Sequence, residues 1–495
     1  MSEAAFEPRR LHPATLLARW LKILPQMLFA GIGLAAAGRG QGLGEGGGRL
    51  LILALVMLVL GGVFAFIYWW RFRYTLGPAE IVIEKGLFQR QRRVIPFDRV
   101  QDIAIEQRLL ARLFGTAKVR IETGGAAKDE GNLDMIALAD AHALRDFIRH
   151  GARPATAEAP AAPAQEPVLF AMDLPRLLYS GLFGFSLIFL AAISAAVQQL
   201  DQIGIVEWED WFTTERADQA AHLVTLRLAL GLAALVIMLG VIAGVARTVA
   251  RDFGFRLTRS EAGLRRKRGL FTLSEVVIPI RRTQVALIES GLVTRALGWH
   301  RLSFQTLGAD KKEGGVQVAA PFARMDEILP ILAEAGFPAP PPRAAFRSRP
   351  RRALVRRIAP HLMLGLPLTA AAFLFDWRAG IGAAALAMLA LAAVLRWRIH
   401  GHAEDARALY VTGGLLRRRL RVLPYEKIQT ISVSRGPVQR RLRLATLIAD
   451  TAGASAMQSV QIIDLDATQA DAEADRLYAA FIEARGRIRV RASHG

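Results

Sequence analysis

The hydrophobic pattern divides the chain into long apolar blocks separated by charged, alternating segments. Six blocks reach or approach the roughly 20 residues that an α-helix needs to cross a bilayer. They occur in pairs, and the predicted membrane-spanning helices are 21–37 with 51–70, 177–197 with 228–245, and 362–375 with 381–395. The third pair is the shortest, so a re-entrant or interfacial element is an alternative for it.

The distribution of Lys and Arg around these blocks predicts their orientation. Basic residues precede and follow each pair, whereas the connection 38–49 is rich in glycine and the connection 201–218 is acidic. By the positive-inside rule, both termini and the segments after each pair are cytoplasmic. Arg19 and Lys22 in the first block argue against a cleaved signal peptide. We therefore expect a multi-pass protein of a bacterial cytoplasmic (inner) membrane.

The segments that follow the three pairs repeat the same residues at constant spacing. The first two copies are offset by 183 residues (Gly86 to Gly269) and the last two by 145 (Gly269 to Gly414), without gaps. Each copy contains a glycine, a proline, a glutamine, an arginine and a threonine: Gly86, Pro96, Gln101, Arg112 and Thr123; Gly269, Pro279, Gln284, Arg295 and Thr306; Gly414, Pro424, Gln429, Arg440 and Thr451. A gap-free match of this kind indicates a triplicated unit.

Within each copy, short β-branched or alternating segments predict strands, and an amphipathic segment predicts one closing helix. Strands are predicted at 81–83, 119–123, 135–138, 302–306, 316–319, 409–411 and 460–465, and helices at 141–148, 325–332 and 472–482. This order predicts a small two-sheet barrel or sandwich capped by a helix. The Ala/Pro-rich segments 153–166 and 337–350 are predicted to be flexible or polyproline-like linkers.

These patterns divide the chain into hairpins, repeated domains and linkers. The predicted hairpins with their flanks are 1–70, 176–250 and 358–396. The repeated domains are 71–152, 251–336 and 397–495, the last including a tail, and the linkers are 153–175 and 337–357. The predicted fold class is therefore membrane α + β, with three repeats of a helical hairpin followed by a β-rich domain.

The glycine turn, the Ile-Pro segment ending in glutamine and the position directly after a hairpin resemble the bacterial PH-like domain of membrane proteins of the YdbS/YdbT type. Three copies and six spans are most like the three-domain, YdbT-like member. The resemblance implies a PH-like fold of two packed antiparallel sheets with a C-terminal helix. It also implies a companion, a smaller membrane protein with a single PH-like domain.

Composition narrows the possible chemistry. The 495 residues include no cysteine, which excludes disulfides, thiolate catalysis and Cys-ligated metal centres. The formal net charge of +21 indicates an anionic partner, either nucleic acid or an anionic lipid surface. Because the sequence has no zinc-finger, helix-turn-helix or RRM signature, we expect the partner to be anionic phospholipid of the membrane and expect no nucleic acid.

Basic clusters near the repeated glycine are the candidate contacts with an anionic surface. They are Arg90, Arg92 and Arg93; Arg265, Arg266, Lys267 and Arg268; and Arg417, Arg418, Arg419 and Arg421. Within about a Debye length (~8–10 Å) of an anionic leaflet, each Lys or Arg contributes on the order of 1 kcal/mol. The alternative is a solvated face that only reinforces topology. The charges lie differently in the second copy, which argues against three identical phospholipid pockets.

The other repeated residues have a structural interpretation. We expect each Pro to fix an edge or bulge, and each Gln to satisfy backbone groups at a strand turn. Residues 42–47 match G-x-G-x-x-G, but they lie between two predicted spans with no preceding strand, which indicates a flexible loop. His400 and His402 have no further ligands nearby in sequence. We therefore predict no catalytic, metal-binding or cofactor-binding residues and no enzymatic activity.

Two functions remain from the sequence. The first is a membrane scaffold whose cytoplasmic domains bind the anionic lipid surface, a companion membrane protein or both. The second is a component of a lipid or peptide transport or export system that protects the cell envelope. The second function requires a polar path among the spans, which their scarcity of interior charge does not favour.

Overall fold

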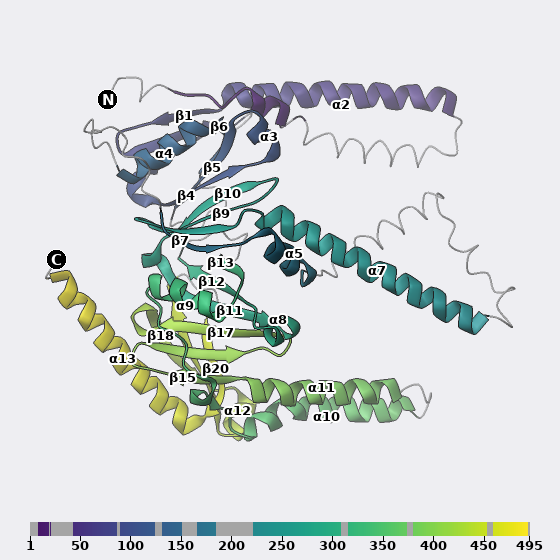
Figure 1. Ribbon diagram of the computed structural model, residues 1–495, viewed down its shortest axis with the longest axis vertical. Helices are drawn as coiled ribbons and strands as arrows, with labels where there is room; N and C mark the ends of the chain where they lie inside the picture. Colours follow the sequence, from purple (N-terminus) through teal and green to yellow (C-terminus); the bar gives the residue numbers. More distant parts are fainter. Residues whose placement is uncertain are drawn as a thin grey trace. The chain divides into compact units, whose positions relative to one another are not determined.

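The structure is a computed structural model that describes residues 8–18, 20, 43–86, 90–123, 131–150, 166–184, 221–307, 315–373, 380–452 and 459–493. The chain divides into two compact units. The first contains residues 1–166, 171–256 and 266–277, and the second contains residues 167–170, 257–265 and 278–495. Figure 1 shows the helices and strands, coloured in the order of the chain.

The first repeated domain, in the first unit, consists of two small antiparallel sheets and a helix. One sheet has the order β1 (Arg73–Leu76), β2 (Glu80–Lys85) and β3 (Gln91–Pro96). The other contains β4 (Val100–Gln107), β5 (Thr116–Thr123) and β6 (Gly131–Ala137), and α4 (Leu138–His150) closes the domain. Ile81, Val119 and Leu133 are fully buried in a shared core, because alternate residues of each strand point inward.

The third repeated domain, in the second unit, follows the same plan. Its first sheet contains β15 (Gly401–Glu404), β16 (Ala408–Gly413) and β17 (Arg417–Pro424). Its second has the order β18 (Ile428–Ser434), β19 (Leu444–Thr451) and β20 (Val460–Asp466), followed by α13 (Ala467–Ser493). Leu409, Leu447 and Leu477 come from the two sheets and the helix and lie in one core.

The middle domain contributes strands to both units. Its strand β10 (Leu273–Ile278) pairs with β4 in the first unit. The second unit contains β11 (Thr283–Gly291), β12 (His300–Thr306), β13 (Val316–Ala323) and α9 (Met325–Glu334). Residues 257–260 of β8 (Arg256–Ser260) and 263–265 of β9 (Gly263–Arg268) also belong to the second unit.

The repeated domains share sheets instead of forming separate barrels. In the second unit, a seven-stranded sheet has the order β13-β12-β11-β17-β16-β15-β14, so the second domain continues into the third. The segment 337–357, predicted as a linker, supplies β14 (Arg347–Ser348), which pairs with β15. The segment 153–175 likewise supplies β7 (Val168–Ala171). The interpretation of both segments as simple linkers is therefore wrong where they form strands.

Long apolar helices occupy most of the described parts of the predicted spans. They are α2 (Leu43–Arg71), α7 (Ala221–Asp252), α10 (Arg352–Phe373) and α11 (Gly380–Ile399). By length and composition, one described helix segment, Gly382–Ile399, is long enough and apolar enough to cross a membrane, and Leu58–Arg71 is a shorter apolar helix. The predicted spans 21–37 and most of 177–197 lie outside the described residues. Three membrane-spanning hairpins therefore remain a prediction.

The helix ends differ from the predicted boundaries. α2 begins at Leu43, inside the glycine-rich connection, so residues 43–47 are helical and the predicted flexible loop is wrong there. In the second hairpin, α5 (Leu174–Leu182) packs closely on α7, since a Cβ added to Gly181 would lie 2.7 Å from Val245 Cα. Small residues allow such close approach of two helices.

The repeated glycine, proline and glutamine have the same geometry in each copy. Gly86, Gly269 and Gly414 have φ of 127°, 117° and 92°, a region that disfavours side chains. Each Pro precedes a one-turn 3₁₀ helix, and no bulge occurs at the Pro itself. The bulge lies at the glutamines, where the pairing register shifts: Gln101, Gln284 and Gln429.

Candidate functional site

The site is built where β11 of the second domain pairs with β17 of the third, both in the second unit. The two strands are antiparallel, with Ile288 opposite Leu420 and Glu289 opposite Arg419. Because strand side chains alternate between faces, the basic cluster of β17 divides into two sets. Arg419 lies on one face with Arg417, while Arg418 lies on the other face with Leu420.

Arg417 and Arg419 share one carboxylate, that of Glu289. The Nε atom of Arg419 donates a hydrogen bond of 2.9 Å to Glu289 Oε1, and Arg417 Nη2 lies 3.0 Å from Glu289 Oε2. The Glu289 side chain is only 9% exposed, whereas both arginines are about half exposed. Their charge is therefore partly used in holding the two strands together and is less available to an external anion.

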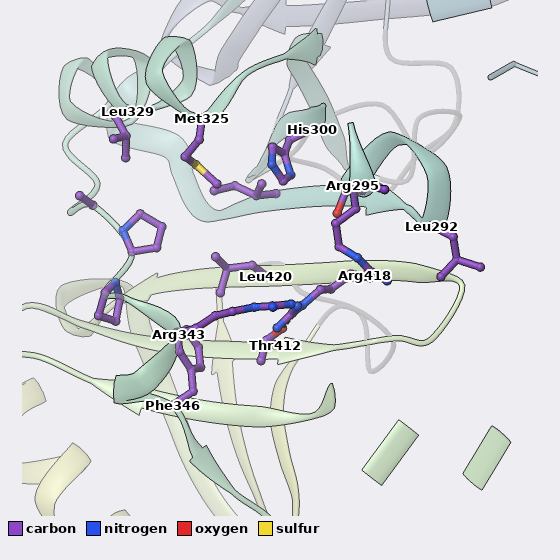
Figure 2. Close-up of a pocket in the computed structure, with 16 residues that line it drawn as sticks. Leu292, Arg295, His300, Met325, Leu329, Arg343, Phe346, Thr412, Arg418 and Leu420 are labelled. Atoms are coloured by element: carbon purple, nitrogen blue, oxygen red, sulfur yellow. Dashed lines mark hydrogen bonds between the residues drawn. The ribbon is translucent and has the colours of Figure 1, made fainter. Parts of the chain in front are cut away.

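Arg418 lies at a cavity of about 570 Å³ on the opposite face. The residues that line it come from β11, α8 (Leu292–Ala296), β12, α9, β16, β17 and the Pro-rich segment before β14. Figure 2 shows Arg295 of α8 and Arg418 of β17 reaching into the space between these elements, with Arg343 on the side of the Pro-rich segment. A pocket of this size suits a small-molecule ligand.

Positive charge gathers in this cavity without a neutralising carboxylate. Arg295, Arg343 and Arg418 line it, and none of the described lining residues is Asp or Glu. The Nη1 atom of Arg295 is buried and donates no hydrogen bond. Arg418 donates through Nε to Thr412 Oγ1 at 3.2 Å. Three guanidinium groups with no carboxylate among the described lining residues give the cavity a positive potential, which favours an anion.

Arg295 differs from its counterparts in the other copies. In the first domain, Arg112 Nη1 donates to the carbonyl oxygen of Leu270 at 2.8 Å. In the third, Arg440 Nε donates to the carbonyl oxygen of Arg435 at 3.1 Å. Both counterparts are satisfied by the backbone, whereas Arg295 Nη1 remains without an acceptor. Arg295 therefore differs from its two counterparts, and it lies at the cavity.

Local geometry fixes Arg295 at the cavity. The short helix α8 begins after Gly291, whose N–H donates to Thr294 Oγ1 at 2.8 Å. It ends before Gly298, whose φ of +76° suits the left-handed residue that terminates a helix. On the opposite wall, the hydroxyl of Tyr410 in β16 donates to the carboxylate of Asp405 at 2.5 Å. Hydrogen bonds therefore fix elements on both sides of the cavity.

The rest of the lining is mainly apolar. Figure 2 shows Met325 and Leu329 of α9 and Leu420 of β17 around the cavity. Burial lowers the pKa of His300, so its ring is uncharged at neutral pH and adds no further cation. The cavity therefore has a cationic part, formed by three guanidinium groups, and an apolar wall beside it.

The basic clusters of the other two copies lie in different surroundings. Arg90 and Arg92 are exposed, and Arg92 forms an ion pair of 3.7 Å with Glu84 on the neighbouring strand β2, while Arg93 is half-buried. In the second cluster, Lys267 is exposed and Arg265 is half-buried. The anionic-surface role of the exposed residues stays a prediction.

Two residues of the second cluster correct the sequence interpretation. Arg266 is only 1% exposed, so it is not a surface contact. Arg268 Nη1 lies 3.0 Å from the buried carboxylate of Asp252, which holds β9 to the end of α7. Period-two alternation along β9 places Arg266 inside the domain, which a simple count of basic residues does not reveal.

Three cavity residues were not singled out as functional from the sequence. Arg295 was noted only as a repeat marker, and Arg343 lay in a presumed linker. His300 stands next to Trp299 at the start of β12. The sequence did contain one signal for Arg295, because an arginine recurs at this position in all three copies. Among the described residues, no group of three His, Cys, Asp or Glu side chains forms a possible metal site.

Comparison with known proteins supports the repeat. The family model described as Bacterial PH domain matches the chain three times, over residues 27–152, 188–335 and 361–481. The chain is also 24% identical over 425 residues to UPF0699 transmembrane protein YdbT of Bacillus subtilis (strain 168). That match covers 81% of this chain and 83% of the relative. No solved structure matches the chain. The resemblance inferred from the repeated residues is confirmed.

Proposed function

Since this chain belongs to the bacterial PH domain family, we propose that it is a membrane-associated, non-enzymatic protein that binds an anionic amphiphile in the Arg295–Arg343–Arg418 cavity. The ligand class is a lipid with an anionic headgroup, such as phosphatidylglycerol. The observation that carries the proposal is the gathering of Arg295, Arg343 and Arg418 on one cavity whose described lining includes no carboxylate.

The division of the cavity into a cationic and an apolar part supports a lipid over a free anion. Guanidinium groups form paired, charge-assisted hydrogen bonds with phosphate oxygens. Leu292, Met325 and Leu329 give the remaining wall an apolar surface that a phosphate ion leaves unfilled. The name of the relative, a transmembrane protein, supports placing the chain at a membrane.

The wider scaffold role is supported by the exposed basic residues of the first two domains. The exposed residues Arg90, Arg92 and Lys267 suit contact with an anionic leaflet, as expected from the sequence. A smaller single-domain companion in the same membrane stays part of the proposal, without an assigned surface. The transport alternative gains no supporting observation from the described helices.

Lipid titration of the purified full chain tests the proposal. Native mass spectrometry would compare phosphatidylglycerol, phosphatidylethanolamine and glycerol phosphate, which separate headgroup charge from the hydrocarbon part. We expect phosphatidylglycerol to bind most tightly, and R295Q/R418Q to weaken it by roughly 10-fold or more, the value of a charge-assisted hydrogen bond. R407Q/R441Q removes the same charge from exposed positions outside the cavity lining and should bind like the wild type.

Two results of that titration would overturn the proposal. Equal binding of all three compounds would show that the cavity does not select an anionic lipid. Equal loss in R295Q/R418Q and R407Q/R441Q would show that binding follows net charge alone.

A further inference from the structure

The two junctions between successive domains use equivalent strands in the same register. At the first junction β4 pairs with β10, with Ile105 opposite Glu275. At the second, β11 pairs with β17, with Ile288 opposite Leu420. These pairs are related by the repeat spacings, because Ile105 and Ile288 are 183 residues apart and Glu275 and Leu420 are 145 apart. The chain therefore contains one type of junction twice.

The third domain also contains the strand equivalent to β4 and β11, but among the described strands no second domain pairs with it. By repeat spacing, β18 is the counterpart of β4 and β11. It lies at the edge of the sheet β18-β19-β20 and pairs with β19 alone among the described strands. Its Thr430, Ser432 and Ser434 are exposed, whereas nearly all of β11 is buried. Its backbone edge is free for another strand.

The first domain has the complementary strand, β3, which pairs with β2 alone among the described strands. β3 is the counterpart of β10 and β17, and it lies at the edge of the sheet β1-β2-β3. Its Val94 is 44% exposed, whereas the corresponding Val277 of β10 and Val422 of β17 are 2% and 0% exposed. One chain thus carries both halves of the junction, one at each end of its series of domains.

We propose that β18 of one copy pairs with β3 of a second copy, antiparallel and in the register of the two internal junctions. Extending the repeat spacing places Ser434 opposite Gln91 and Ser432 opposite Arg93. Such a contact is head to tail, so it builds a ring or an open row of copies. The main-chain hydrogen bonds are those of strand addition at a sheet edge.

Charge and edge composition support this occupant. At the first junction, Arg145 of α4 forms an ion pair of 2.6 Å with Glu275 of the joining strand. In the third domain, α13 packs against β18 and presents the exposed carboxylate of Asp475, while β3 brings the exposed Arg92. β18 also contains no Lys or Pro, the residues that commonly block an edge strand.

The absence of cysteine in the chain permits a direct test. Two differently tagged copies, one carrying S434C and the other Q91C, would be co-expressed and oxidised in the membrane. Residues opposite each other on paired strands lie within the Cα separation that a disulfide allows. We expect the dimer bearing both tags as the main cross-linked product. S434C with V94C is the control, because Val94 lies three residues out of register and on the other face.

Further results decide the proposal even where oxidation is inefficient. Transferring the opposed charges of Glu289 and Arg419 to the open edge, as S434E and Q91R, should tighten self-association about two- to five-fold. No cross-link above the V94C control, together with no gain from the charged pair, would overturn the proposal. A cross-link from S434C to a different polypeptide would equally overturn the second copy as the occupant.

Discussion

Glu289 of β11 and Arg419 of β17 face each other across the junction of two domains, 130 residues apart in the chain, with Arg419 Nε 2.9 Å from Glu289 Oε1. Arg417 binds the second oxygen of the same carboxylate. This pairing explains why basic residues can be concentrated on β17. It also leaves Arg418, on the opposite face, available to the cavity.

Removing the junction carboxylate should destabilise the second unit. E289Q leaves Arg417 and Arg419 without a charged partner, next to Arg421, whose pKa is lowered by burial and by Arg419. Because the arginines are about half exposed, we expect a loss of about 1 kcal/mol, or roughly 2–4 °C in Tm. Thermal unfolding of the purified chain measures this. Exposed Glu426 provides the control E426Q, and equal Tm values for the two variants would contradict a role for Glu289.

A second ion-pair network ties α10 to the third domain. Asp464 is fully buried, accepts a hydrogen bond of 2.9 Å from Gln439, and lies 2.7 Å from Arg356 Nε and 3.7 Å from Arg357 Nε. D464N keeps the shape and tolerates the φ of 64° but removes the charge, so we expect a loss of about 3 kcal/mol in unfolding free energy.

Limited proteolysis and thermal unfolding would measure that loss. D471N is the matched control, since Asp471 pairs with Arg435 at an exposed position. If D464N were as stable as D471N, the network would not hold α10 to the domain. Arg356 and Arg357, which lie in α10 before the predicted span 362–375, would then act as topology signals without a structural role.

The carboxyl of Glu404 should make stability depend on pH. Burial, followed by its hydrogen bond and charge interaction with Glu473, raises its pKa from 4.5 to about 8. Between these values the folded chain holds a proton that the unfolded chain has lost, so stability falls as pH rises from about 4.5 to about 8. E404Q removes this titration. Solvent screening at this half-buried carboxyl reduces the effect to about 1 kcal/mol, so we expect the Tm of E404Q to decline less than that of the wild type between pH 5 and pH 8, by roughly 2–4 °C. The exposed-site variant E261Q should follow the wild type, and a wild-type slope in E404Q would exclude Glu404 as the cause.

The repeated glycine before β17 should tolerate no side chain. Gly414 has φ of 92°, and an added Cβ would lie 2.0 Å from the carbonyl oxygen of Arg417. We expect G414A to cost about 1–3 kcal/mol and to weaken lipid binding by displacing β17. G486A in α13 meets no neighbouring atom and should stabilise the helix slightly. Thermal unfolding of both variants distinguishes strain at Gly414 from a general effect of the added methyl group.

The elements within each domain could be predicted because their signals are local. The alternation at 119–123 and 302–306 lies inside β5 and β12, and the helical spacing at 325–332 lies inside α9. The same local rule also explains errors in the site. The basic runs in β17 and β9 look like single clusters in the sequence. In the strands, alternation places Arg418 and Arg266 on faces different from those of their neighbours.

The junctions and the cavity could not be predicted because they depend on long-range pairing. Nothing local to β11 indicates that its neighbour is β17, and the segment around Arg343 has the composition of a linker. The gap-free repeat did hold usable information about Arg295. Its counterparts Arg112 and Arg440 bind backbone carbonyls, so an arginine at this position is first a structural residue. Its role in the cavity follows only from the three-dimensional arrangement.

Analysis of the lipid retained by the purified protein tests the central claim most directly. The full chain, its R295Q/R418Q variant and its R407Q/R441Q control would be extracted in a mild detergent, and bound lipids quantified per mole of protein. The account predicts that the wild type and the control retain anionic phospholipid in excess over its share of the membrane, and that R295Q/R418Q loses this enrichment. Retained lipid of membrane composition in the wild type, or undiminished enrichment in R295Q/R418Q, would contradict it.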